Sequence, residues 1–160
     1  MYLYHKDYPL KQKTLDYTLR AAWMAVSKMY NREASKFDST MATGFALLNI
    51  DPEGTPSTAL GPKMGMENTS LSRLLKTMEE RQLIERKPDP ADGRGVLIFL
   101  TPFGKEKRNI SREVVLNFNE KVSRELSETQ LKHFFEVSEA IIEQSLSSEH
   151  ITLNPLNKAI

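Results

Sequence analysis

The chain has 160 residues, of which 39% are hydrophobic and 27% are charged, and its formal net charge is +1. This length suits one domain with helical extensions. The sequence contains no cysteine, which excludes disulfides, cysteine-ligated zinc and thiol chemistry. No apolar run is long enough to span a membrane, and the first ten residues lack the apolar core of a secretory signal. We therefore expect a cytoplasmic protein without a membrane segment.

Basic residues concentrate in the middle of the chain. Residues 57–112 contain eleven Lys or Arg and seven Asp or Glu, whereas the remaining residues contain eleven and fourteen. A local excess of positive charge is expected where a protein meets nucleic acid. The asymmetry is mild, so it supports such a function only together with other signals.

Two helices are predicted before residue 51. The first covers residues 10–37, where apolar residues recur at three- and four-residue steps. It is longer than an average helix and needs a broad apolar partner, which a dimer or a helical bundle would supply. The second covers residues 41–50, with Ser39 or Thr40 as its cap. Its expected buried side consists of Phe45, Leu47, Leu48 and Ile50.

The next two predicted helices are separated by a tight turn. A short helix is expected over residues 56–64, with Thr55 as its cap, and Gly65 should end it. Pro62 would disturb this helix, so we expect it to begin late, near Thr58, or to be kinked. A second helix follows from residue 67, with Glu67 or Asn68 as its cap. Its apolar face is formed by Leu71, Leu74, Leu75 and Met78.

A β-hairpin and two further helices complete the predicted order. Strands are expected over residues 83–87 and 96–100, because the segment between them is rich in Pro, Gly and Asp. Thr101 and Pro102 start a long helix over residues 102–126. Residues 127–130 form a capping box, which begins a last helix that ends near residue 147. Residues 1–9 are expected to form an arm and residues 148–160 an extended tail.

The helix after Gly65 and the hairpin carry the residues suited to nucleic acid. Small hydroxyls, an Asn and an Arg at the start of a helix reach base edges and phosphates in a major groove. A basic hairpin suits the neighbouring backbone or minor groove. A polar helix face is more often simply solvated, but a helix and a basic hairpin in this order favour DNA. The residues expected to contact DNA are Lys63, Asn68, Thr69, Ser70, Ser72, Arg73, Lys76, Arg86, Lys87, Asp92 and Arg94.

The run LLKTMEERQLIERKPDPADGRGVLIFLTPFGK resembles the MarR family of bacterial winged helix-turn-helix regulators. The most specific part is the Asp-Pro-x-Asp-x-Arg hairpin of residues 89–94, followed by Leu-Thr-x-x-Gly at residues 100–104. Ser72-Arg73-Leu74 and residues 83–86 also match. The resemblance covers residues 39–108, whereas the flanking helices match in length and pattern only. Gly93 stands where the family often has an arginine, so one phosphate or groove contact would be missing.

The resemblance implies a mainly α fold with a small β-hairpin wing and long terminal helices that form a dimerisation domain. We expect residues 1–38 and 102–160 to form the dimerisation region and residues 39–101 the DNA-binding domain. The implied function is a cytoplasmic, homodimeric transcription regulator, most simply a repressor, that binds a palindromic operator in double-stranded DNA. Arg94 would enter the minor groove, and Asp92 would orient Arg86 or Arg94. For Asp92 and Arg94, the alternative is an ion pair that only holds the hairpin together.

The resemblance also implies a small aromatic effector that binds between the dimerisation helices and the winged domain. The candidate lining residues are Tyr17, Trp23, Tyr30 and Phe45, each of which could instead be a core residue. The alternative function is a winged-helix protein-interaction module without DNA binding, which Gly93 and the near-zero net charge favour. No metal-ligand spacing, phosphate-binding loop or nucleophile motif is present in the sequence. We therefore expect no cofactor, no metal and no enzymatic activity.

Overall fold

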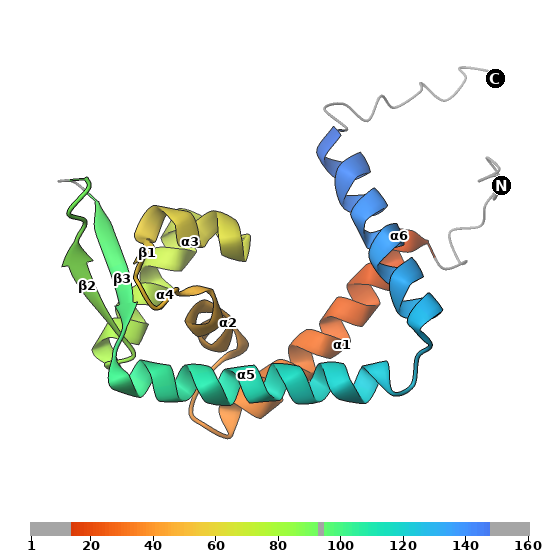
Figure 1. The fold of residues 1–160 in the computed structure, drawn as a ribbon, viewed down its shortest axis with the longest axis horizontal. Helices are drawn as coiled ribbons and strands as arrows, with labels where there is room; N and C mark the ends of the chain where they lie inside the picture. The colour runs from red at the N-terminus through yellow and green to blue at the C-terminus, as the bar shows by residue number, and fades with distance from the viewer. Residues whose placement is uncertain (1–13, 93–94, 148–160) are drawn as a thin grey trace, which may run out of the picture. The chain divides into compact units, whose positions relative to one another are not determined.

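The computed structural model describes residues 14–92 and 95–147, which form a mainly helical chain with one small antiparallel sheet, as predicted (Figure 1). Its contacts divide the chain into two compact units, one up to Leu116 and one from Asn117. The elements are α1 (Leu15–Ser35), α2 (Met41–Asn49), β1 (Thr55–Pro56), α3 (Ser57–Met64), α4 (Asn68–Glu80), β2 (Ile84–Pro88), β3 (Val96–Leu100), α5 (Pro102–Ser123) and α6 (Glu128–Ser147).

The first two helices begin at capping threonines. Thr14 is extended and its side chain accepts a hydrogen bond from the Tyr17 N–H, so α1 begins at Leu15 rather than at residue 10. Residues 10–13 of the predicted helix lie outside the described ranges. Thr40 caps α2 as predicted, since its hydroxyl accepts from the Thr43 N–H at 3.1 Å. Both caps satisfy an amide that has no partner within the helix.

The prediction that Thr55 caps α3 is wrong. Thr55 lies in strand β1 opposite Ile98, and its hydroxyl accepts from the Asp51 N–H at 2.8 Å. Helix α3 begins at Ser57, so it does not start late, and it contains Pro62. Pro62 has no N–H to donate to the carbonyl of residue 58, so α3 lacks that hydrogen bond in its last turn. Gly65 ends α3 as predicted, at φ +60°, a left-handed conformation that glycine adopts without strain.

The sheet has the strand order β1–β3–β2, with β3 in the centre. In the β2–β3 hairpin, Ile84 lies opposite Leu100 and Pro88 lies opposite Val96. Strand β2 is thus an edge strand with its proline at the last position, where the missing N–H costs little. The predicted hairpin is confirmed, but the two-residue strand β1 that pairs with the other edge of β3 was not predicted.

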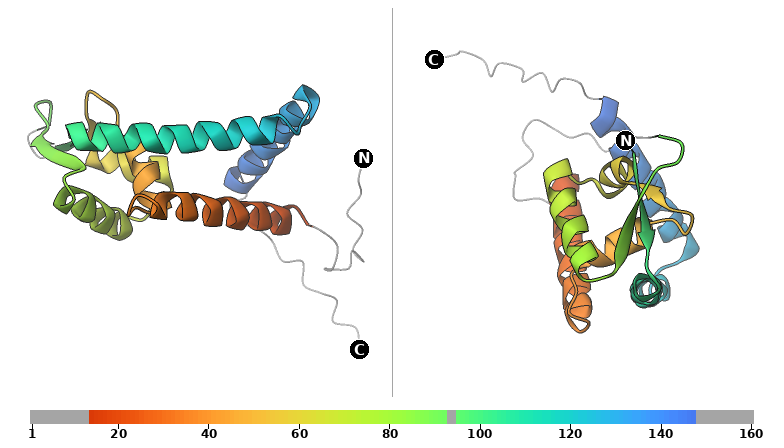
Figure 2. Two further views of the ribbon diagram at one scale, coloured as in Figure 1. Left: turned by 90° about the horizontal axis from the view of Figure 1, so that it is seen from below. Right: turned by 90° about the vertical axis from the view of Figure 1, so that its left-hand side faces the viewer.

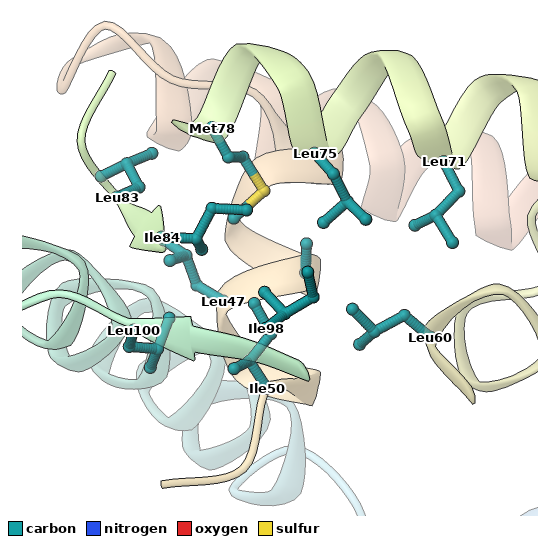
Figure 3. Packing of buried hydrophobic residues seen from close by; sticks show 11 residues of the cluster. Leu47, Ile50, Leu60, Leu71, Leu75, Met78, Leu83, Ile84, Ile98 and Leu100 are labelled. Carbon is teal, nitrogen blue, oxygen red and sulfur yellow. The ribbon is translucent and has the colours of Figure 1, made fainter. Parts of the chain in front are cut away.

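The core of the first unit lies between α4, α2, α3 and the sheet. Three residues of the predicted apolar face of α4 are buried and point into this cluster, and Leu74 packs against it (Figure 3). Phe45 was expected to be buried in α2, but its side chain is 44% exposed because α2 turns only its other side toward the cluster. The buried cluster consists of Ala46, Leu47, Ile50, Leu60, Leu71, Leu75, Met78, Leu83, Ile84, Ile98 and Leu100.

A close contact joins the residues that follow α4 to the first turn of α5. The Thr101 hydroxyl donates to the Gln82 carbonyl at 2.6 Å and accepts from the Gly104 N–H at 2.9 Å. A Cβ atom at Gly104 would lie only 1.9 Å from the carbonyl oxygen of Leu83. Figure 2 shows α4 on one side of the hairpin and the first turns of α5 on the other. Glycine is therefore required where α5 meets the backbone beside the sheet.

The second unit contains the end of α5 and helix α6. The predicted capping box is confirmed, because the Ser127 hydroxyl accepts from the Gln130 N–H and the Gln130 side chain accepts from the Ser127 N–H, at 3.2 and 2.8 Å. Neither α1 nor α6 has a buried residue within the described chain. Large apolar side chains of these helices are instead exposed, among them Trp23 at 59%, Phe134 at 59% and Leu146 at 79%. None of the described helices is both long and apolar enough to cross a membrane.

Candidate nucleic-acid interface

Helix α4 presents a continuous polar surface next to its buried face. The six predicted DNA-contact residues of α4 are all exposed, at its N-terminal end and along one side. Glu67 is the N-cap residue of α4, but its side chain makes no capping hydrogen bond, contrary to the expectation that Glu67 or Asn68 caps the first amides. The surface therefore has donors and acceptors that are free to meet a partner. It consists of Asn68, Thr69, Ser70, Ser72, Arg73 and Lys76.

Arg73 and Lys76 differ in their surroundings. Lys76 lies 3.9 Å from Glu80, one turn further along α4. Arg73 has no ion pair or hydrogen bond among the described residues. Exposed pairs such as Lys76–Glu80 are weak, so they do not prevent a lysine from moving to a phosphate. Arg73 is thus the cation of α4 with the fewest competing contacts.

Both predicted cations of strand β2 have acidic neighbours. Arg86 Nε lies 3.0 Å from Glu79 Oε2, which ties the strand to the end of α4. Lys87 Nζ lies 2.7 Å from Glu85 and 4.9 Å from the centre of the Phe99 ring. Glu79 was not predicted as a partner of Arg86, because a contact between a helix and the following strand gives no periodic signal in the sequence.

The turn of the hairpin is held by its own backbone and by Asp89. The Asp89 carboxylate accepts from the Ala91 N–H at 2.9 Å, and the Gly95 N–H donates to the Asp92 carbonyl at 2.8 Å. These bonds close the turn that the two strands require. Arg94 and Gly93 lie outside the described residues, so the expected roles of Arg94 and of its pairing with Asp92 stay predictions.

Lys63 lies at the end of α3, where it pairs with an acid that the sequence analysis did not single out. Its ammonium donates to Asp51 Oδ2 at 3.0 Å, and this hydrogen bond, followed by the charge of Lys63, lowers the pKa of Asp51. The buried Thr55 hydroxyl also donates to Asp51, at 3.3 Å. The carboxylate thus links the turn after α2 to the end of α3.

The Asp51–Lys63 pair should make stability depend on pH. Because the folded pKa of Asp51 is lowered, its contribution is complete above the unfolded pKa, about 3.9 for an aspartate, and is lost as pH falls through the folded value. Asp51→Asn should therefore lower the urea midpoint at pH 6, and the difference from the parent chain should shrink at pH 3. In the Asp51→Asn background, adding Lys63→Met should not lower the urea midpoint further at either pH. An equal loss at both pH values would contradict this account.

A hollow of about 580 Å³ is lined by residues of α1, α2 and α5 and by residues that precede and follow α4, and we call it the apolar hollow. Trp23, Tyr30 and Phe45, three of the four predicted lining residues, line it, whereas Tyr17 does not and is 65% exposed. Burial raises the pKa of Tyr30 above its ordinary value. The exposure of Phe45 is explained by its place in this wall. Aromatic, methionine and aliphatic side chains dominate the wall, which suits an apolar or aromatic molecule.

Within the described ranges, no group of three or more His, Asp or Glu side chains could hold a metal ion. In the part of the chain that the structure describes, hydrogen bonds lower the pKa values of three carboxylates, Asp16, Glu33 and Asp51, and burial raises the pKa of Tyr30. Hydrogen bonds to exposed carboxylates are ordinary for a solvated surface. The arrangement of polar α4, paired hairpin and apolar hollow therefore suggests binding rather than catalysis.

Residues 41–96, from α2 to the first residue of β3, match the model of the MarR family. The chain contains a MarR-family domain. The members of this family are transcription regulators rather than enzymes. The matched segment includes every predicted DNA-contact residue, from Lys63 to Arg94.

Solved MarR-family structures have the same fold. The Staphylococcus aureus MepR–DNA complex matches at a TM-score of 0.72 with 21% identity, over 86% of this chain and 99% of that chain. PcaV from Streptomyces coelicolor, in complex with its natural ligand, matches at 0.70 with 19% identity, over 83% and 94%. A MarR variant from E. coli complexed with operator DNA matches at 0.71 with 20% identity, over 79% and 92%. A search of curated proteins gave no significant match.

These identities are low, so the likeness establishes the fold alone. The mainly helical chain with its small antiparallel sheet has the winged-helix fold of these structures. In it, a tight turn at Gly65 separates α3 from α4, and α4 keeps its polar side exposed. The fold prediction is thereby confirmed.

Proposed function

We propose that the protein is a DNA-binding transcription regulator that reads a major groove with α4. The exposed surface of α4, with Arg73 unpaired in the described chain, carries this proposal. Arg73 and the small polar residues beside it can reach base edges, whereas Lys63, Lys76, Arg86 and Lys87 can reach phosphates. Two structures of the same fold, MepR and MarR, were solved with DNA, which supports the proposal.

Substitutions on α4 should separate specificity from affinity. Arg73→Ala is expected to relax base preference at one position per half-site, by about 1–3 kcal/mol of discrimination. Lys76→Ala is expected to weaken binding to all sequences alike, since phosphates carry no sequence information. Both effects can be measured by binding to a panel of operators with single base changes. Lys132→Ala, an exposed lysine of α6, is the matched control and should change neither. An unchanged preference profile for Arg73→Ala would count against the assignment.

We further propose that the protein acts as a homodimer. Apolar side chains on α1 and α6 are exposed in the single chain, and a second copy would cover them. Sedimentation equilibrium at micromolar concentration should give twice the 18.3 kDa mass of the chain. Leu146→Glu, at the most exposed of these apolar positions, should shift the equilibrium toward the monomer, whereas Glu53→Lys, at an exposed position outside α1 and α6, should not. A monomer at all concentrations would contradict the dimer.

A homodimer has a two-fold axis, so the operator would be palindromic, with half-sites about one helical turn apart. The simplest outcome of binding is repression. Release would follow from a small aromatic molecule in the apolar hollow, whose wall includes Trp23, Tyr30 and Phe45. PcaV, which has the same fold, was solved with its natural ligand, and this supports a ligand site in the chain.

A winged-helix protein-interaction module is the second candidate. The acidic neighbours of four predicted DNA contacts favour it, because they partly neutralise the surface that would meet phosphate. All four pairs are exposed and therefore weak in water. The salt dependence of DNA binding distinguishes the two candidates.

A further inference from the structure

Four predicted phosphate contacts each have an acidic neighbour, and one of these four pairs differs from the others in its chemistry. Three of the pairs are made by lysines, through the end of a flexible ammonium. The fourth joins Arg86 of β2 to Glu79 of α4, with Nε of the arginine 3.0 Å from Oε2 of the glutamate. A planar guanidinium held from another element has a more restricted orientation than a lysine ammonium.

The closest contact of the Arg86 side chain uses the inner nitrogen of its guanidinium. Among the described residues, this side chain has no second ion pair and no hydrogen bond. A guanidinium has five N–H donors, four of which are on the two outer Nη atoms. With Nε facing Glu79, the edge formed by the Nη atoms can bind two oxygens of one phosphate, which is the bidentate geometry that distinguishes arginine from lysine.

The backbone of both partners belongs to well-packed elements. Glu79 follows Met78 in α4, and the Met78 side chain is fully buried in the core (Figure 3). Arg86 lies in β2 opposite Ile98 of the central strand, which is also fully buried. Packing therefore fixes the two backbone positions, and the ion pair restricts the freedom that remains to the arginine side chain. A contact group that is ordered before binding loses less entropy when it binds.

We propose that Glu79 is a positioning residue that directs the Nη edge of Arg86 toward a DNA phosphate. This inference rests on the proposed DNA-binding function. Phosphate contacts set the register of a protein on the duplex, so a restrained Arg86 would help to align the polar surface of α4 with the bases. The proposal reverses an ordinary expectation. Removal of a carboxylate normally strengthens binding to a polyanion, whereas removal of the Glu79 carboxylate should weaken it.

Affinity measurements on the full-length protein test this sign. The probe is the duplex that the parent chain selects most strongly from a random pool. Glu79→Ala should weaken binding by about threefold or more, whereas Glu79→Gln, which keeps an oxygen within reach of Arg86, should bind within about twofold of the parent chain. Glu80→Ala is the matched control, because it removes the adjacent carboxylate of α4, which lies 3.9 Å from Lys76. It should bind as tightly as the parent chain or more tightly.

A map of phosphate contacts separates positioning from a purely structural role. The phosphates of the duplex are replaced one at a time by neutral methylphosphonates, and the loss of affinity is measured at each position. The Arg86 phosphate is the position whose replacement weakens the parent chain but not Arg86→Ala. In Glu79→Ala the loss at this position should fall by at least half, while the losses elsewhere persist. The urea midpoint of Glu79→Ala should stay close to that of the parent chain, since both side chains of the pair are exposed, at 45% and 37%.

The outcomes separate the positioning role from the proposed function. Weaker binding by Glu79→Ala, with the change confined to the Arg86 phosphate, supports the positioning role. Unchanged or tighter binding by Glu79→Ala, an unchanged contact map, or a map without an Arg86 phosphate overturns this role and leaves DNA binding standing. If the parent chain selects no duplex, both the positioning role and the proposed DNA-binding function are overturned.

Discussion

Gly104→Ala is expected to destabilise the protein by about 3 kcal/mol, although alanine ordinarily stabilises a helix by about 1 kcal/mol relative to glycine. The added methyl group would lie 1.9 Å from the Leu83 carbonyl oxygen, which is backbone and cannot rotate away. Relief requires α5 to move away from the strand, and that movement would strain the Thr101 hydrogen bonds to residues 82 and 83. The steric clash should therefore make Gly104→Ala destabilising, although helix propensity alone predicts that it stabilises the protein.

Urea denaturation measures this effect as a lower midpoint at an unchanged slope. Asn109→Ala, at an exposed position of the same helix, is the control and should be neutral or slightly stabilising. Gly104→Ser should be at least as destabilising as Gly104→Ala. If Gly104→Ala is as stable as the parent chain, the close approach of α5 to Leu83 is not present in solution.

Elements with local signals could be predicted from the sequence. Thr101 and Pro102 mark the start of α5, and Ser127 with Gln130 marks the start of α6, because a cap is formed by residues within one turn of each other. The β-hairpin was predictable for the same reason, since the turn and both strands lie within seventeen residues, 84–100. The motif of residues 89–104 is equally local, and it indicates the MarR family from the amino-acid sequence alone.

Contacts between distant segments could not be predicted. Thr55 carries the ordinary signature of a helix cap, but its pairing with Ile98 places it in a strand. Asp51 reaches Lys63 and Glu79 reaches Arg86 only because the fold brings these elements together. Phe45 matched the apolar period of α2, yet it lines the apolar hollow instead of entering the core.

Several expectations about the site remain predictions. Arg94, the residue expected to enter the minor groove, lies outside the described residues. The division into a dimerisation region, residues 1–38 and 102–160, and a DNA-binding domain, residues 39–101, also remains a prediction. The exposure of α1 and α6 is the observation that supports it.

The affinity for DNA should fall steeply as salt increases. Phosphate contacts release counterions, so the logarithm of the binding constant falls linearly with the logarithm of salt concentration. With about three phosphate contacts in each subunit of a dimer, affinity should fall about a thousandfold between 50 and 200 mM salt. The candidates for these contacts are Lys63, Lys76, Arg86, Lys87 and Arg94. The exposed acidic neighbours of four of them are too weak to cancel this effect.

The salt dependence of binding to the DNA upstream of the protein's own gene tests the DNA-reading role most directly. Binding isotherms at several salt concentrations, with a shuffled duplex and Lys132→Ala as controls, give the slope. We predict a slope of about −5 for the parent chain and a shallower slope for Lys76→Ala. Binding that is absent, or that does not change with salt, would contradict the DNA-reading role and favour the interaction module.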